Sequence, residues 1–189
     1  MTNTISRRTL LTAVPAAGAG LVLAAAPAEA ASARGIDRDA TSALARLYAA
    51  HPQAKTLSTR ARGILIFPKI IKAGLIIGGQ TGDGALRVGG RSVGYYNISA
   101  ASFGLQAGGQ TFSYALFFMT ASSLEYLQKS DGWSIGSGPS IVIVDKGAAA
   151  SLTSTTLTQD VYAFPFGARG LMAGLGLEGS KITRINPDR

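Results

Sequence analysis

The stretch that decides the fold is Gly74-Leu75-x-x-Gly78-Gly79-Gln80-Thr81-x-x-x-Ala85-Leu86. The same spaced phrase returns thirty residues later as Gly104-Leu105-x-x-Gly108-Gly109-Gln110-Thr111-x-x-x-Ala115-Leu116. Eight positions match at a single offset, which predicts two segments with the same structural role. That role is either phosphate binding by an open glycine-rich backbone or close packing within a β-sheet.

The residues that follow the two copies favour the sheet. A phosphate loop needs a Gly-Lys-Ser/Thr sequence and a helix that begins directly after it. Neither copy is followed by such a sequence. Glycines inside strands more often mark bulges, bends or close backbone approach. The two copies are therefore predicted to be equivalent strands of one sheet.

Short apolar runs separated by turn residues surround the repeat. The predicted strands are 64–67, 75–77, 85–88, 93–99, 105–119, 141–144, 161–166, 170–178 and 181–185. One helix is predicted between them, where Ser122-x-x-Glu125 forms a capping box and Asp131-Gly132 ends it. Strands joined by short turns predict an α+β fold, with an antiparallel sheet or barrel-like sandwich, an N-terminal helical arm and one inserted helix.

The arm begins at Asp37 or Asp39, either of which can cap a helix. Apolar residues at helical spacing follow between Ala40 and Tyr48, and a second short helix follows Pro52. The basic residues along the arm are Arg46, Lys55, Arg60 and Arg62. Such an arm either lies on a membrane or packs its apolar stripe on the sheet.

The N-terminus has the pattern of an export signal. Arg7 and Arg8 precede an Ala-rich apolar run, and Ala28-Glu29-Ala30 is a small-x-small cleavage sequence. The adjacent arginines favour twin-arginine export, with the general secretory route as the alternative. We expect a cleaved signal at 1–30, a flexible leader at 31–36 and a single domain at 37–189, located in the periplasm or outside the cell.

Composition narrows the partners of this domain. The chain has no Cys, so it contains no disulfide and no lipid-modified N-terminal Cys of a lipoprotein. Its formal net charge is +8. A basic exported protein favours anionic partners such as phospholipid headgroups, whereas nucleic acid is not expected in that compartment.

Enzyme motifs fail on their context. Gly174-x-Gly176-x-x-Gly179 lacks the helix and the acidic residue that dinucleotide binding requires. Ser134 lies in a Gly-x-Ser-x-Gly sequence, but a helix precedes it and the one histidine, His51, lies upstream. Among the scattered acidic residues, only Asp37 and Asp39 have metal-ligand spacing, and they are better interpreted as a helix cap. We therefore expect no enzymatic activity, no cofactor and no metal.

Basic residues are the remaining candidates for a site. Arg60, Arg62, Lys69 and Lys72 lie within thirteen positions, interleaved with apolar residues of the 64–71 run. Cations beside exposed apolar groups suit an anionic membrane surface. The alternative is that the apolar residues are core and the cations protect a sheet edge.

Eight phrases in order resemble the SYLF domain. They are Gly63-Ile-Leu-Ile-Phe-Pro-Lys, Lys72-Ala-Gly-Leu-Ile-Ile-Gly-Gly, Gly94-Tyr-Tyr, Ala101-Ser-Phe-Gly-Leu-Gln-Ala-Gly, Ala115-Leu-Phe-Phe-Met, Ser130-Asp-Gly-Trp, Val144-Asp-Lys-Gly and Gly170-Leu-Met-Ala-Gly. The resemblance implies a phospholipid-binding domain, with actin binding in eukaryotic members and no established enzymatic activity. Actin is not an expected partner for a chain with a bacterial export signal.

Two functions therefore stand as expectations. The first is an exported, non-enzymatic phospholipid-binding domain acting at an anionic membrane surface of the cell envelope. The alternative is an envelope scaffold that binds another protein or polymer, for which the Ser/Thr-rich stretch 151–158 is the candidate loop.

Overall fold

The computed structural model describes residues 32–74, 77–103, 108–144, 158–170, 177 and 179–188. Within them lie three helices and the strands of one eight-stranded sheet. The elements are α1 (Ala33–Ala50), α2 (Pro52–Ser58), β1 (Gly63–Gly74), β2 (Ile77–Val88), β3 (Arg91–Phe103), β4 (Gly108–Phe118), α3 (Ala121–Lys129), β5 (Trp133–Ser134), β6 (Ile141–Ile143), β7 (Val161–Gly170) and β8 (Lys181–Ile185). The predicted export signal, the strand at 171–176 and most of the Ser/Thr-rich stretch lie outside the described residues.

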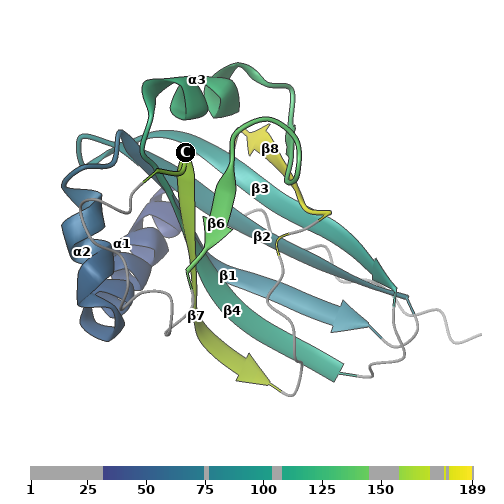
Figure 1. Ribbon diagram of the computed structural model, residues 1–189. Coiled ribbons are helices and arrows are strands. Elements are labelled where there is room, and N and C mark those ends of the chain that lie inside the picture. Colours follow the sequence, from purple (N-terminus) through teal and green to yellow (C-terminus); the bar gives the residue numbers. More distant parts are fainter. Residues whose placement is uncertain are drawn as a thin grey trace, which may run out of the picture.

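The sheet has the strand order β5-β8-β3-β2-β1-β4-β7-β6. Neighbouring strands pair antiparallel, except that β6 runs parallel to β7. Figure 1 shows one curled sheet with α1 and α2 against one side and α3 at one end. Along the chain, α3 follows β4 and precedes β5. The predicted α+β class is confirmed, and of its two forms the structure has the single curled sheet rather than a two-sheet sandwich.

Alternate residues of the strands fill two separate apolar clusters. Ile66, Ala85 and Ala115 pack against the apolar stripe of α1 and α2, on the side that we call the α1 face. Leu65 and Leu86 point to the opposite side, the α3 face, where α3 and β5 complete the cluster. Successive side chains of a strand point to opposite faces, so the near-continuous apolar runs of β1 and β4 reflect burial on both sides.

The two copies of the repeated phrase lie on either side of β1 in the same register. Six shared positions face the same β1 residue from β2 and from β4. The β1 residues and their two partners are Leu65 with Leu86 and Leu116, Ile66 with Ala85 and Ala115, Ile71 with Thr81 and Thr111, Lys72 with Gln80 and Gln110, Ala73 with Gly79 and Gly109, and Gly74 with Gly78 and Gly108. The prediction that the copies are equivalent strands is confirmed.

Two bulges lie beside β4 at the same level. β1 carries one residue more than β4 between Phe67 and Ile70, so the strand continues through Pro68 instead of ending there as the sequence predicted. Proline fits a bulge because it has no N–H to give to the ladder. β7 carries its extra residue next to Gly167, whose φ of +64° favours glycine. Ser113 of β4 fixes the first bulge by donating its hydroxyl to the carbonyl oxygen of Pro68 at 2.7 Å.

Close backbone approach occurs at glycines that the two copies do not share. A Cβ at Gly82 would lie 2.5 Å from the carbonyl oxygen of Lys69, and one at Gly84 would lie 2.6 Å from Cδ1 of Phe67. A Cβ at the shared Gly109 would meet its nearest neighbour, the carbonyl oxygen of Lys72, at 4.0 Å. The prediction of close packing therefore holds for the bulge region of β2 but not for the shared Gly108 and Gly109, while a Cβ at the shared Gly79 would be in ordinary contact at 3.4 Å.

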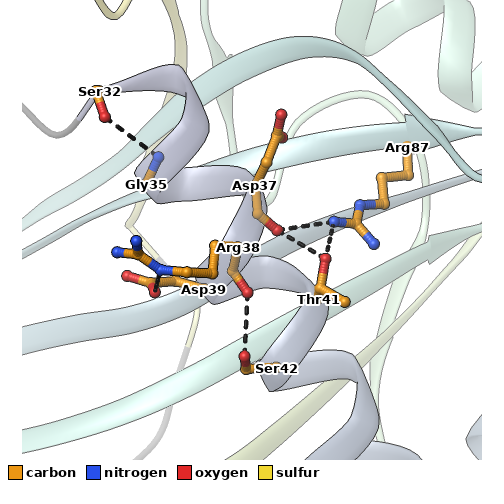
Figure 2. Close-up of polar contacts among 8 residues, drawn as sticks. All are labelled: Ser32, Gly35, Asp37, Arg38, Asp39, Thr41, Ser42 and Arg87. Atoms are coloured by element: carbon orange, nitrogen blue, oxygen red, sulfur yellow. Dashed lines mark hydrogen bonds and ion pairs between the residues drawn. The ribbon is translucent and has the colours of Figure 1, made fainter.

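α1 is tied to the sheet by polar contacts at its first turns (Figure 2). Nη2 of Arg87 donates to the carbonyl oxygen of Asp37 at 2.9 Å and to Oγ1 of Thr41 at 2.6 Å. The carboxylate of Asp37 accepts hydrogen bonds from Ser92 and Tyr95. Of the two predicted roles of the arm, the structure shows packing of its stripe on the sheet.

Both predicted helix caps are wrong by a few residues. α1 begins at Ala33, inside the predicted leader, and its N-cap is Ser32, which accepts from the N–H of Gly35. Asp37 instead serves as an acceptor for the sheet. α3 is capped by Thr120 rather than Ser122, because the Thr120 hydroxyl lies 3.2 Å from the N–H of Ser123. Ser, Thr and Asp can all cap a helix, so several neighbouring candidates make the first residue hard to predict.

Candidate functional site

A cavity of about 440 Å³ lies where α1 passes over the two bulges. α1, β1, β4 and β7 all contribute to its wall. The lining residues are Asp39, Ser42, Arg46, Pro68, Lys69, Thr111, Phe112, Ser113, Gly167 and Arg169. We call this site the basic cavity.

Local structure explains how three cations come together there. Lys69 belongs to the β1 bulge, and Arg169 follows the β7 bulge opposite Thr111. Arg46 lies one helical turn beyond Ser42 on α1, so both residues face the same way. The bulges therefore open the strands at the level where the helix brings its own arginine.

The charges around the basic cavity are unbalanced. Arg46, Lys69 and Arg169 face a single carboxylate, Asp39, and that carboxylate lies 3.5 Å from Nε of Arg38. Figure 2 shows this pair on the opposite side of α1 from the Arg87 contacts. In the described part of the chain, no ion pair joins the three cations to an acidic residue. Three cations around one cavity make it suited to an anion.

Hydroxyl groups supply the uncharged part of the lining. Ser42 donates to the carbonyl oxygen of Arg38 at 3.1 Å, and Ser113 donates to that of Pro68 at 2.7 Å. These bonds fix both oxygens at the cavity wall. Because the single proton of each hydroxyl is already donated, these two oxygens can only accept further hydrogen bonds, and the attraction for an anion comes from the cations.

Other chemistries find little support within the described residues. They contain no group of three or more His, Cys, Asp or Glu side chains that could hold a metal ion. None of the helices that the structure describes has the length and apolar character needed to cross a membrane. His51 is buried, and the centroid of its ring lies 6.2 Å from that of Phe164, whereas Ser134 is exposed on β5.

The four basic residues nominated by the sequence do not line one cavity. Lys69 lines the basic cavity, whereas Arg62 lines a separate groove of about 680 Å³ beside α3. Arg60 lies in the turn between α2 and β1, and Lys72 lies farther along β1, opposite Gln80 and Gln110. Sequence analysis named Arg46 among the basic residues of the helical arm but did not predict that it lies beside Lys69.

Arg169 was missed altogether. Its place depends on the pairing of β7 with β4, between residues 58 positions apart. The one sequence signal is Gly167 two residues earlier, because glycine after an apolar strand often marks a bulge. That signal indicates a bend but not which strand lies beside it.

Comparison with known families matches residues 99–187 to the family Ysc84, described as "Las17-binding protein actin regulator". The matched segment contains β4, β7 and β8, and it includes Thr111, Ser113 and Arg169 of the basic cavity. Comparison with curated proteins gives no match. The resemblance to the SYLF domain is thereby confirmed for residues 99–187, which match the Ysc84 (SYLF) family, a family of the lipid- and actin-binding type.

Proposed function

We propose that this protein is an exported, non-enzymatic phospholipid-binding domain that acts at an anionic membrane surface, and that the basic cavity receives the lipid phosphate. The observation that carries the proposal is the convergence of Arg46, Lys69 and Arg169 on one cavity with a single carboxylate. The family supports a lipid partner in general terms.

The size and lining of the cavity fit a headgroup better than an acyl chain. Ligand pockets for small molecules usually measure about 300–1,000 Å³, and this cavity measures about 440 Å³. Most of its lining residues carry a charge or a hydroxyl group. Phe112 is the large apolar residue in the lining, and its side chain is buried. The acyl chains would therefore remain in the bilayer while the phosphate enters the cavity.

The compartment favours lipid over actin as the partner. The family description concerns actin regulation. The predicted export signal, with Arg7, Arg8, Ala28 and Ala30, would place the mature chain in the cell envelope. A protein of net charge +8 is attracted to any anionic lipid at that surface.

Vesicle sedimentation tests the proposal. The full chain is mixed with vesicles of phosphatidylcholine, with or without phosphatidylglycerol, at low salt. The test variant combines Arg46→Gln, Lys69→Gln and Arg169→Gln. Because each basic residue near an anionic surface contributes about 1 kcal/mol, the variant should bind about 100-fold more weakly.

A matched control removes the same charge elsewhere. It combines Arg34→Gln, Lys55→Gln and Arg91→Gln, three exposed residues outside the cavity lining. All proteins keep the same N-terminal segment, so differences in binding report on the substituted residues. Equal losses in both variants would reduce the effect to net charge and refute the cavity. Recovery of hydrolysed lipid after incubation would refute the non-enzymatic part of the proposal.

A further inference from the structure

The helices cover only part of the α1 face. Figure 1 shows strands β1–β4 extending well beyond α1 and α2. The part that no other described element covers lies past the β1 bulge, where Ile71 and Ala73 point to the same side as Ile66. We call it the open half of the α1 face.

One row of paired residues crosses this open half. Residues directly opposite each other on neighbouring strands present their side chains to the same face. From β7 to β8 the row contains Arg169, Thr111, Ile71, Thr81, Ser99 and Lys181. It has a cation at each end, hydroxyls inside them and an isoleucine in the middle.

The next row is made of small residues. Ala73 lies opposite both Gly79 and Gly109, and Gly79 lies opposite Ala101. The described residues of this row, Ala73, Gly79, Gly109 and Ala101, include no long side chain beside Ile71. A flat surface could therefore approach the strands closely.

The exposure of Ile71 is unusual for its position. β1 is a central strand, with strands paired on both sides, and the rest of its apolar run is largely buried. Yet Ile71 is 46 % exposed, the largest exposed fraction among the large apolar side chains of the described residues. A single exposed apolar side chain is ordinary on a protein surface, so the feature to explain is its combination with the cations at both ends of the same row.

The open half is continuous with the basic cavity. Thr111 and Arg169 belong both to the cavity lining and to the row that contains Ile71. A lipid held by the cavity would thus place its neighbours against Ile71. Ile71 matches the acyl boundary of an anionic bilayer, and the cations around it match the headgroup layer.

We infer that the open half of the α1 face is the surface that lies on the bilayer, with Ile71 entering the headgroup region beside the lipid held in the cavity. This inference rests on the proposed function. A second copy of the chain is a poorer occupant, since it would bring Lys69, Arg169 and Lys181 against cations of its own kind. The carboxylate on this face, Asp83, already accepts a hydrogen bond from Asn97 at 2.7 Å.

The absence of Cys from the sequence gives a clean test. Ile71→Cys and, as a control, Gln128→Cys on α3 each introduce one thiol for an environment-sensitive fluorophore. Gln128 is exposed and lines the groove beside α3, at the opposite end of β1. With vesicles of phosphatidylcholine and phosphatidylglycerol, the label at position 71 should shift to the blue and the label at 128 should not.

A second pair of variants measures affinity without a label. Ile71→Ser should weaken vesicle sedimentation about five-fold, the factor expected for losing burial of roughly half an isoleucine side chain. Ile143→Ser is the matched control, because Ile143 is 38 % exposed but lies on the edge strand β6. It should leave sedimentation unchanged.

The outcomes separate this inference from the proposed function. If the chain binds vesicles but the label at 71 stays in water, the inference is wrong and the function stands. If the label at 71 is already shifted without vesicles, another part of the chain or a second copy covers the face, and the inference is again wrong. If the chain does not bind anionic vesicles at all, both fail.

Discussion

β2 and β4 carry the same phrase and hold the same register against β1, yet they differ between the shared positions. Gly82 and Gly84 of β2 correspond to Phe112 and Tyr114 of β4, thirty residues later. The rings of Phe112 and Tyr114 lie 5.5 Å apart in a perpendicular arrangement on the α3 face. On the β2 side, Phe67 and Ile70 lean over the two glycines instead.

This difference shows how a repeat divides its tasks. The shared Gly, Gln, Thr, Ala and Leu residues set the pairing, because the same six positions face β1 from both sides. The unshared positions set the shape: glycines on one side admit the bulge of β1, and aromatic residues on the other fill the core. The bulge in turn places Lys69 at the basic cavity.

The glycines of β2 provide the largest expected effect. Gly84→Ala would place a Cβ 2.6 Å from Cδ1 of Phe67 and against the carbonyl oxygen of Ile66, which must shift. We expect a loss of about 1–3 kcal/mol in the free energy of unfolding, measured by urea denaturation. Gly109→Ala, whose new Cβ meets its nearest neighbour at 4.0 Å, should change it by no more than about 0.5 kcal/mol. Equal losses would mean that close approach does not distinguish the two strands.

The aromatic residues of β4 give a prediction about how the free energy of unfolding depends on pH. Burial raises the pKa of the Tyr114 phenol well above its ordinary value of about 10. Above about pH 10 the unfolded chain releases this proton while the folded chain keeps it. The free energy of unfolding is therefore unaffected by this group below that pH and decreases as the pH rises above it. The slope for one such group is at most about 1.4 kcal/mol per pH unit.

Tyr114→Phe should remove this part of the slope. Urea denaturation between about pH 9 and pH 11 compares the variant with the parent protein. Burial also raises the pKa of Tyr95 and Tyr96, but both are present in the two proteins and cancel. Parallel curves for the two proteins would show that Tyr114 ionises as easily in the folded state as in the unfolded state.

Sequence reasoning reached the fold because its signals are local. The repeated phrase, the apolar stripe between Ala40 and Leu47 and the strand at 181–185 each follow from spacing within one segment, and the structure confirms them. The bulges were not predicted. Pro68 looked like the end of a strand, since proline breaks a ladder in most contexts, and only the partner strands show that the chain continues.

The candidate site was predicted in part for the same reason. Lys69 stands in a basic, apolar stretch that is visible in the sequence. Arg46 and Arg169 reach the same cavity through helix packing and strand pairing, which connect residues more than a hundred positions apart. Two-residue spacing predicts which face a side chain occupies, but not which distant element shares that face.

The glutamines at the shared positions give the smallest and most direct comparison. Gln80 and Gln110 both lie opposite Lys72, and both are buried. Nε2 of Gln80 donates to Oγ of Ser180 at 2.9 Å, whereas among the described residues no donor reaches Oε1 of Gln110. Losing one partner of a buried hydrogen bond destabilises a protein, but replacing an unpaired polar group by an apolar one of similar size is nearly neutral or stabilising.

Methionine has nearly the shape of glutamine, so the same substitution can be made in both copies. Gln80→Met should lower the free energy of unfolding by about 1 kcal/mol, because it leaves the buried Ser180 hydroxyl without its donor. Gln110→Met should leave that free energy unchanged or raise it. If urea denaturation instead showed a loss for Gln110→Met and none for Gln80→Met, Gln110 rather than Gln80 would make the stronger hydrogen bonds. Both glutamines keep the same register against Lys72, although their outer neighbours differ, Ala100 for Gln80 and Gly170 for Gln110, and neither of these is a polar side chain. The hydrogen bond to Ser180 is therefore the polar contact that the pair of variants compares.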